Sequence, residues 1–208
     1  MEGLRGDEYG MILIGTPMYG GFCQQEYFRS CLNLVEELTL KGIPYDFSLI
    51  KNESLITRGR NIIADGFLKS EAEVLIFIDG DIEFTPKGVS DLWNLYVETS
   101  QVTCGAYRRK GETETKVWKD GKEIPLPESP TEIDYAGTGF MLIPRQVLYT
   151  LKAKHPDWER RDGIYAFFQD DGLDLSEDYF FCKHAREAGF KIICDPDIKL
   201  THWGRKGY

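Results

Sequence analysis

The chain has 208 residues, of which 42% are hydrophobic, and its formal net charge at pH 7 is −9. Length and composition suit one folded domain spanning residues 1–208, and they exclude the fibrous and disordered classes. Nucleic-acid binders gain affinity by neutralising phosphates, so the acidic balance argues against a nucleic-acid partner.

The ends of the chain and its cysteines bear on localisation. The first ten residues lack the apolar core of a secretory signal, and no apolar run has membrane-spanning length. The five cysteines form no Cys-x-x-Cys pair, which favours reduced thiols. We therefore expect a cytoplasmic protein without a membrane segment. A fragment of a longer polypeptide with further domains is compatible with this sequence.

The first half of the chain alternates apolar strand patterns with helical patterns. Strands are expected at residues 11–15, 45–50, 73–79 and 102–107. Helices are expected at residues 23–41 and 57–69, and again from Pro86, where Thr85 can provide the N-cap. The alternation predicts an α/β fold with a mixed, mainly parallel central sheet and helices on both faces.

The second half is less regular. Residues 108–130 are polar and are expected to form a surface excursion with a hairpin around Asp120-Gly121. A strand-like stretch follows at 133–143, then helices at 144–154 and 176–188, and a last strand at 191–194. Because ligands bind at the carboxyl ends of parallel strands, the 16–21 loop, the turn at Asp79 and the segment from Arg108 are expected at one edge.

The strongest chemical signal is Asp79-Gly80-Asp81, which directly follows the apolar strand. Two carboxylates one residue apart suit Mg²⁺ or Mn²⁺, and a glycine between them permits a sharp turn and close approach to a ligand. Such a metal can neutralise the charge that develops on a diphosphate leaving group. An Asp-x-Asp triplet also arises often by chance. The metal-site interpretation therefore depends on the position of the triplet directly after an apolar strand.

The order of these motifs resembles the GT-A family of nucleotide-sugar glycosyltransferases. The resemblance covers the opening strand with Thr16-Pro17, the Asp-x-Asp triplet, and three later motifs, which are Gly137-Thr138-Gly139-Phe140, Glu177-Asp178 and His202. As an isolated domain the chain is also similar to the N-terminal part of a multidomain glycosyltransferase encoded by chlorella viruses. This resemblance implies a GT-A (Rossmann-like) fold and, for a viral protein, the host cytoplasm.

The resemblance implies a metal-dependent transferase that uses a UDP-sugar donor and a glycan acceptor. Asp81 would bind Mn²⁺ or Mg²⁺ directly, Asp79 would reach the metal or the ribose, and His202 would complete the coordination. Residues 1–107 would bind the nucleotide and residues 108–208 the acceptor. The further candidates for nucleotide-sugar contacts are Thr16, Pro17, Tyr19, Arg58, Asn61, Asp65, Gly80, Gly137, Thr138 and Gly139.

Several of these residues have ordinary structural explanations. Tyr19 can stack on uracil or simply belong to a strand-to-helix turn. Arg58 suits a phosphate but can also be a solvated basic residue. Asp65 can meet the ribose or pair with an arginine. The glycines at 137 and 139 indicate either close approach of a ligand or packing against a neighbouring element.

The candidate general base lies at the start of the helix at 176–188. A single-displacement, inverting reaction needs a carboxylate near the acceptor hydroxyl. The family pattern favours Asp178 over Glu177, although Ser176 and two acids are also ordinary N-terminal helix residues. Asp170 and Asp171 are rival bases. Among the aromatic residues, Tyr165 and Trp203 are the expected acceptor contacts.

Two other functions remain open from the sequence. A nucleotidyltransferase that makes a sugar nucleotide also uses paired aspartates and a metal, but the 16–21 loop lacks the lysine or arginine usual there. A non-catalytic nucleotide-sugar binding module would keep the aspartates without needing a base. The sugar itself is undetermined, with UDP-glucose and a UDP-deoxyhexose both compatible.

Overall fold

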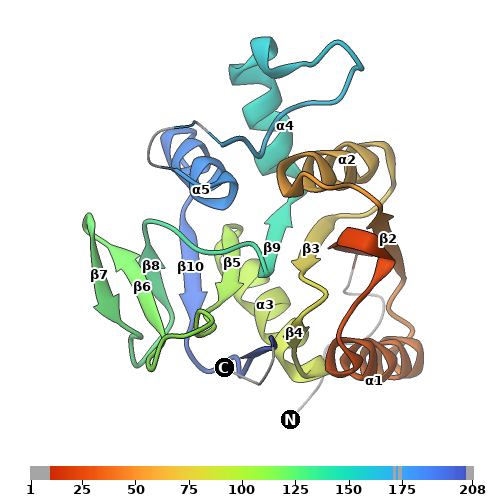
Figure 1. Cartoon of the computed structure of the whole chain (residues 1–208), viewed down its shortest axis with the longest axis vertical. Coiled ribbons are helices and arrows are strands. Elements are labelled where there is room, and N and C mark those ends of the chain that lie inside the picture. Colours follow the sequence, from red (N-terminus) through yellow and green to blue (C-terminus); the bar gives the residue numbers. More distant parts are fainter. Residues whose placement is uncertain (1–9, 171, 173–174, 205–208) are drawn as a thin grey trace.

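The computed structural model describes residues 10–170, 172 and 175–204. A seven-stranded sheet runs through the molecule in the order β2-β1-β3-β9-β5-β10-β8 (Figure 1). Its strands are β1 (Ile12–Met18), β2 (Tyr45–Lys51), β3 (Val74–Ile78), β5 (Val102–Gly105), β8 (Thr131–Ile133), β9 (Phe140–Pro144) and β10 (Ile192–Asp195). Strands β2, β1 and β3 pair in parallel, as do β5 and β10, whereas β9 and β8 run antiparallel to their neighbours. The prediction of a mixed, mainly parallel sheet is confirmed.

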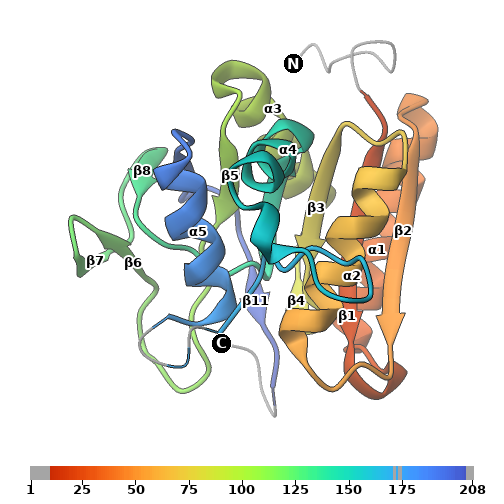
Figure 2. The same ribbon diagram turned by 90° about the horizontal axis from the view of Figure 1, so that it is seen from above.

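Helices cover both faces of the sheet, as expected. They are α1 (Gln25–Lys41), α2 (Ile56–Lys69), α3 (Pro86–Thr99), α4 (Arg145–Lys154) and α5 (Glu177–Glu187), with short 3-10 turns η2 (Tyr19–Gly21) and η3 (Pro156–Trp158). Figure 2 shows α2, α4 and α5 together on one side of the sheet. None of the helices in the described residues is both long and apolar enough to cross a membrane.

The pleat of the central strands divides the core into two layers. In β1, Leu13 faces the layer under α2, α4 and α5, while Ile12 and Ile14 face the layer under α1 and α3. Strand β3 divides in the same way, with Leu75 and Phe77 on the first face. A strand buried on both faces requires an unbroken apolar run, which is the pattern that the sequence has here.

Strand β1 is longer than predicted. We expected it to end at Gly15, but it continues to Met18, so Thr16 and Pro17 lie in the strand rather than in a loop. Up to Gly15 the strand pairs with both β2 and β3, and beyond it pairs with β2 alone. A proline is tolerated in a strand where one side has no ladder, because the missing N–H leaves no bond unmade.

The strand-like stretch at 133–143 is not continuous. It joins the end of β8 to most of β9, and the glycines at 137 and 139 lie in the loop between these strands rather than in a strand. The hairpin prediction is confirmed: β6 (Lys116–Lys119) and β7 (Lys122–Pro125) flank Asp120-Gly121. Both turn residues have positive φ, 52° and 72°, as a two-residue hairpin turn requires.

One pairing was not anticipated. The short strands β4 (Ile82–Glu83) and β11 (Thr201–His202) form a separate antiparallel ladder, in which His202 is opposite Ile82. The ladder continues with the backbone N–H of Trp203, which donates to the carbonyl of Asp81 at 2.7 Å. This ladder brings the end of the chain to the acidic turn after β3.

Candidate active site

The acidic turn begins where β3 ends and is fixed by backbone hydrogen bonds. The N–H of Asp79 donates to the carbonyl of Gly139 at 3.0 Å, and the N–H of Ile82 donates back to Asp79 at 3.0 Å. Gly80 has no positive φ. Its missing side chain instead admits the backbone around Cys23, because a Cβ on Gly80 would lie 3.3 Å from the Cβ of Cys23. Gly80 therefore lies in the sharp turn that we expected, and its missing side chain also permits the close packing against Cys23.

Arg60 is a buried arginine that pairs with Asp79, the first of the two aspartates. This arginine is only 3% exposed, and its guanidinium contacts the Asp79 carboxylate at 3.0 and 3.1 Å. Its Nε also faces Glu177 at 3.5 Å. Burial opposes the charge of Arg60, but the two carboxylates outweigh it and raise the pKa of the guanidinium. Arg60 therefore stays charged and joins the acidic turn to the start of α5.

Asp81, the other aspartate, faces away from Arg60 and meets two different partners. Its Oδ2 lies 2.6 Å from Nζ of Lys110 and 3.4 Å from Nε2 of His202. Burial alone would raise the pKa of Asp81, but hydrogen bonds from His202 and Lys110 lower it below the ordinary value. The carboxylate is consequently ionised and available to a cation.

Few side chains near Asp81 could hold a divalent metal. Within the described part of the chain, no group of three or more histidine, cysteine or acidic side chains gathers as a metal site. Asp81 and His202 still form a suitable pair, since their facing atoms are 3.4 Å apart and adjacent octahedral ligands lie about 3 Å apart. A cation that keeps water and takes phosphate oxygens needs only one or two protein ligands. The donor set fits Mn²⁺ or Mg²⁺ through Asp81 and His202, while Asp79 is held by Arg60.

Tyr107 explains both glycines of the loop between β8 and β9. Its buried hydroxyl accepts the N–H of Gly139 at 3.1 Å. A Cβ added at Gly137 or Gly139 would overlap that same hydroxyl. The close approach that we read from the glycines is therefore made by a neighbouring side chain. Thr138 between them is fully buried and does not reach a cavity, and its hydroxyl has no hydrogen-bond partner in the described residues.

A cavity of about 310 Å³ opens on the β1 side of the acidic turn. It is lined by Pro17, Tyr19, Phe22, Cys23, Gln24, Asp79, Gly80 and Asp81. Two of its aromatic side chains are largely exposed, Tyr19 at 75% and Phe22 at 82%. We call this the β1-side cavity. Its aromatic and acidic lining suits a base and a metal-bound diphosphate.

Other predicted nucleotide contacts point elsewhere. The hydroxyl of Thr16 is buried and bonded to that of Tyr27 at 2.6 Å. Asn61 is fully buried, and its amide exchanges two hydrogen bonds of 2.9 Å with the backbone of Phe168. Neither side chain is free for a nucleotide, because both are occupied by the fold itself. Asn61 instead fixes the irregular segment after α4 against α2.

Arg58 and Asp65 also have local partners. Arg58 is half-exposed, and its Nε faces Glu53 at 3.4 Å. Asp65 pairs with Lys69, one turn further along α2, at 2.6 Å rather than with an arginine. Neither residue lines the β1-side cavity. The arginine of α2 that reaches the acidic turn is Arg60 rather than Arg58.

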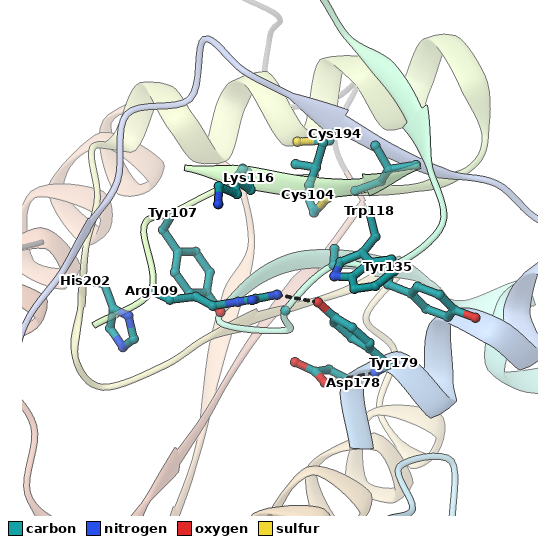
Figure 3. A pocket seen from close by; sticks show the side chains of 16 residues that line it. Cys104, Tyr107, Arg109, Lys116, Trp118, Tyr135, Asp178, Tyr179, Cys194 and His202 are labelled. Atoms are coloured by element: carbon teal, nitrogen blue, oxygen red, sulfur yellow. Dashed lines mark hydrogen bonds between the residues drawn. The ribbon is translucent and has the colours of Figure 1, made fainter. Parts of the chain in front are cut away.

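A second cavity, of about 250 Å³, lies on the far side of His202. Figure 3 shows its aromatic wall of Trp118, Tyr135 and Tyr179, with Asp178 at the mouth and Cys104 and Cys194 behind. The rings of Tyr135 and Tyr179 are stacked at 4.8 Å, and Tyr179 accepts a hydrogen bond of 2.7 Å from Arg109. We call this the aromatic cavity. Flat rings beside a carboxylate suit a sugar whose hydroxyl must be deprotonated.

The two acids at the start of α5 have different surroundings. Glu177 is directed to Arg60, and its pKa is raised by burial and by Asp178 despite that arginine. Asp178 instead lines the aromatic cavity. One of its oxygens accepts hydrogen bonds from the Ser176 hydroxyl and from the Tyr179 N–H. Ser176 occupies the N-cap position of α5, but its side chain does not cap the helix. The geometry favours Asp178 over Glu177 as a base for a ligand in that cavity.

Asp170 and the expected acceptor contacts Tyr165 and Trp203 do not line either cavity. Asp170 accepts the N–H of Gly172, and Asp171 is outside the described residues. Tyr165 is buried near Phe167 and bonds Glu159 at 3.4 Å. Trp203 donates through its indole N–H to Glu83 at 2.9 Å, which holds the β4–β11 ladder together. The prediction of acceptor contacts at Tyr165 and Trp203 is therefore not supported by their positions.

The fold of this chain is similar to the folds of several solved structures. No protein-family model and no curated protein matches the sequence. Similar solved structures include A197 from STIV, with 20% identity, a TM-score of 0.63, and coverage of 93% of this chain and 86% of that one. GalNAc-T7 with UDP, GalNAc and Mn²⁺ has 12% identity and a TM-score of 0.61 over 94% of this chain. The chain has the GT-A fold.

A third similar structure shows that this chain spans only part of some of these proteins. S. aureus TarS 1–349 in complex with UDP-GlcNAc has 16% identity and a TM-score of 0.52 over 92% of this chain. The chain spans 57% of that structure and 43% of GalNAc-T7. At these identities the likeness establishes the GT-A fold, and the activity of this chain rests on its own residues.

Sequence reasoning missed four residues of the site: Tyr107, Lys110, Tyr135 and Tyr179. Two more were considered but ranked lower, because Arg58 was preferred to Arg60 as a phosphate contact, and Tyr165 and Trp203 were preferred to Trp118 as acceptor contacts. For Arg60 a buried-face signal existed, because it shares the buried face of α2 with Ile63, Ala64 and Phe67. A charge on an apolar stripe calls for a buried partner. The aromatic wall carried no such signal, since its members come from three separate segments of the chain.

Proposed function

We propose that this chain is a metal-dependent glycosyltransferase domain that moves a sugar from a UDP-sugar to a hydroxyl of a carbohydrate acceptor. The observation that supports it most is the placement of one acidic turn between two cavities. Asp81 borders the β1-side cavity, and its partner His202 borders the aromatic cavity, which also holds Asp178. A donor and an acceptor could thus meet across the Asp81–His202 pair.

The donor is assigned to the β1-side cavity. Its walls come from β1, the turn after it and the acidic turn, all within residues 1–107, which we proposed as the nucleotide-binding part. Tyr19 or Phe22 would stack on the uracil, and the diphosphate would lie toward Asp81. UDP is also the nucleotide bound in the GalNAc-T7 and TarS structures, and GalNAc-T7 holds Mn²⁺ as well.

A bound Mn²⁺ or Mg²⁺, held by Asp81 and His202, would supply positive charge toward the diphosphate as it leaves. Arg60 pairs with Asp79 and fixes the position of its carboxylate relative to the donor. Tyr107 fixes the backbone of the glycine loop at the junction of the cavities. These residues position the donor before the reaction begins.

The acceptor is assigned to the aromatic cavity, with Asp178 as the general base. The acceptor oxygen attacks the anomeric carbon while its proton passes to Asp178. The bond from that carbon to the UDP oxygen breaks, and its electron pair stays on the leaving UDP. A single displacement of this kind inverts the anomeric centre. The cytoplasmic, viral setting expected from sequence remains part of this proposal.

The experiment is donor turnover with and without Mn²⁺ in wild type, Asp178→Asn and Glu177→Gln. We expect the first variant to lose about 10²- to 10⁴-fold in kcat, since that is the usual contribution of a positioned base. Its affinity for UDP, measured by calorimetry, should stay unchanged. The Glu177→Gln variant should keep more activity, because Glu177 faces Arg60 rather than the acceptor cavity.

Other outcomes separate the alternatives. A chain that binds UDP-sugars but never turns them over is a non-catalytic binding module. Release of pyrophosphate from UTP and a sugar phosphate would indicate a nucleotidyltransferase. If the product keeps the anomeric configuration of the donor, the reaction is not a single displacement. If no UDP-sugar binds to the chain, the whole proposal is overturned.

A further inference from the structure

The lysine beside Asp81 occupies the place where the proposed metal would be bound. Nζ of Lys110 lies 2.6 Å from Oδ2 of Asp81, and this is the same oxygen that faces His202. A metal bonded to that oxygen at about 2.1 Å would lie within a few ångströms of the ammonium. Two cations at that separation repel strongly in a partly buried site. Lys110 and a metal therefore compete for one carboxylate oxygen.

The segment that carries Lys110 is anchored on its other side. Its neighbour Arg109 donates to the Tyr179 hydroxyl at 2.7 Å (Figure 3). Arg109 also donates to Glu123 at 2.9 Å. The backbone at 109–110 is thus tied to the aromatic cavity. The Lys110 side chain is 43% exposed and has a flexible four-carbon stem, so it can move its charge while the backbone stays in place.

Once the Lys110 ammonium leaves Asp81, the donor diphosphate would be its nearest new partner. The donor diphosphate would lie against Asp81, within the range of a lysine that had just left that carboxylate. The arginine next to the turn, Arg60, is already held by Asp79 and Glu177 and is buried. Among the residues that the structure describes, Lys110 is therefore the basic side chain best placed to follow the phosphate.

We propose that Lys110 is an exchangeable cation: it holds Asp81 while no metal is bound, yields that oxygen to the metal, and then contacts the donor diphosphate. This inference rests on the proposed function, because it takes Asp81 as the metal ligand. It adds a donor-positioning residue on the segment after β5. It also couples metal binding to the segment that borders the aromatic cavity.

The first test uses Mn²⁺ alone, titrated into wild type and Lys110→Ala and followed by the paramagnetic resonance of free Mn²⁺. We expect Lys110→Ala to bind Mn²⁺ up to about fivefold more tightly, since an exposed ion pair is worth up to about 1 kcal/mol. Lys87→Ala is the matched control. Lys87 also pairs with an aspartate, Asp91, at 2.6 Å, but along helix α3.

The second measurement is UDP binding in saturating Mn²⁺, by calorimetry. Here the same Lys110→Ala variant should bind about tenfold more weakly, because a charge-assisted contact to phosphate is lost. Opposite changes in the two affinities are the signature of exchange, and a purely structural role would not produce them. Lys87→Ala should change neither affinity, and circular dichroism verifies that both variants are folded.

The results distinguish this inference from the proposed function. Equal Mn²⁺ affinity in wild type and Lys110→Ala, abolished by Asp81→Asn in both, would overturn the exchange and leave the metal site standing. Binding of Mn²⁺ by Lys110→Ala alone would support competition by Lys110 and overturn metal dependence of the wild type. No Mn²⁺ binding by either chain, with or without UDP, would overturn both.

Discussion

The hydroxyl of Tyr107 accepts the backbone N–H of Gly139 at 3.1 Å, and the N–H of Asp79 donates to the carbonyl of the same glycine at 3.0 Å. Gly139 therefore connects the end of β5 to the acidic turn after β3. Burial, followed by Asp79 and Asp178, raises the pKa of Tyr107 well above its usual range. The hydroxyl stays protonated and neutral, so it can lie between two carboxylates without adding charge.

This relationship makes a prediction about Gly137. A Cβ there would lie 2.5 Å from the Tyr107 oxygen, but 3.3 Å from the ring carbon that carries it. Gly137→Ala should cost about 1–3 kcal/mol in wild type, as overpacking does. In Tyr107→Phe the same change should cost less by about 1 kcal/mol, because the clashing oxygen is gone. Urea unfolding of the four chains measures this coupling.

Gly66→Ala controls for the loss of a glycine as such. Gly66 lies in α2, and nothing lies within 4 Å of a Cβ placed there. This substitution should be neutral or stabilising by up to about 1 kcal/mol, because alanine favours a helix. If Gly137→Ala costs the same with and without the tyrosine hydroxyl, then Tyr107 does not account for that glycine.

A second prediction compares two arginines of α2. Arg60→Ala leaves Asp79 and Glu177 without their buried partner, so it should cost about 3–5 kcal/mol of unfolding free energy. Arg58→Ala removes a half-exposed side chain paired loosely with Glu53 and should stay within about 0.5 kcal/mol. Chemical denaturation distinguishes them. A larger loss at Arg58 than at Arg60 would contradict the assignment of the anchor.

A third prediction concerns pH and His184 on α5. Burial lowers the pKa of His184 below its ordinary 6.5. Glu187, whose carboxylate lies 2.9 Å from the ring, raises this pKa, but its effect is smaller. The unfolded chain then takes up a proton at a higher pH than the folded one. The contribution of His184 to stability is therefore complete above pH 6.5 and declines as the pH falls through that value toward the folded pKa.

The measurement is urea unfolding at several values between about pH 7.5 and 5.5. Wild type should lose stability over this range, and His184→Gln should show a smaller loss, because glutamine does not titrate. Carboxylates contribute the same background slope to both chains, so the difference isolates the histidine. A steeper slope in the variant would show that the sign is wrong.

The extent to which sequence predicted the structure follows from how local each signal is. The strand before Asp79 and the hairpin at Asp120-Gly121 were predictable, because an apolar run and a positive-φ turn are written in adjacent residues. The division of residues 133–143 was not, because that loop is shaped by Tyr107, about thirty positions earlier in the chain.

The same reasoning applies to the site. His202 was identified through a family resemblance, but its contact with Asp81 depends on the β4–β11 ladder, which joins two-residue strands too short to leave a pattern. Asn61 was a candidate ligand contact because it lies beside two arginines near the start of the helix that precedes the strand before Asp79. Its actual partner, the backbone of Phe168, is more than a hundred residues away and carries no side-chain signal.

The last prediction tests the aromatic cavity as the acceptor site. Trp118 lies on β6 of the hairpin, and its ring meets Tyr135 edge-on at 6.5 Å. It contacts neither the acidic turn nor the β1-side cavity. Trp118→Ala should therefore raise the acceptor KM about tenfold, because aromatic contacts of this kind are worth about 0.5–1.5 kcal/mol beyond burial. Affinity for UDP and Mn²⁺ should not change.

Tyr165→Phe is the matched control, because Tyr165 was the acceptor contact expected from sequence and lies outside the cavity. Steady-state kinetics with a fixed donor and varied acceptor, together with donor hydrolysis without acceptor, separate the two sites. A Trp118→Ala variant that weakens UDP binding but leaves the acceptor KM unchanged would place the acceptor elsewhere. The mouth of the cavity next to Asp178 would then need another ligand to account for its aromatic wall.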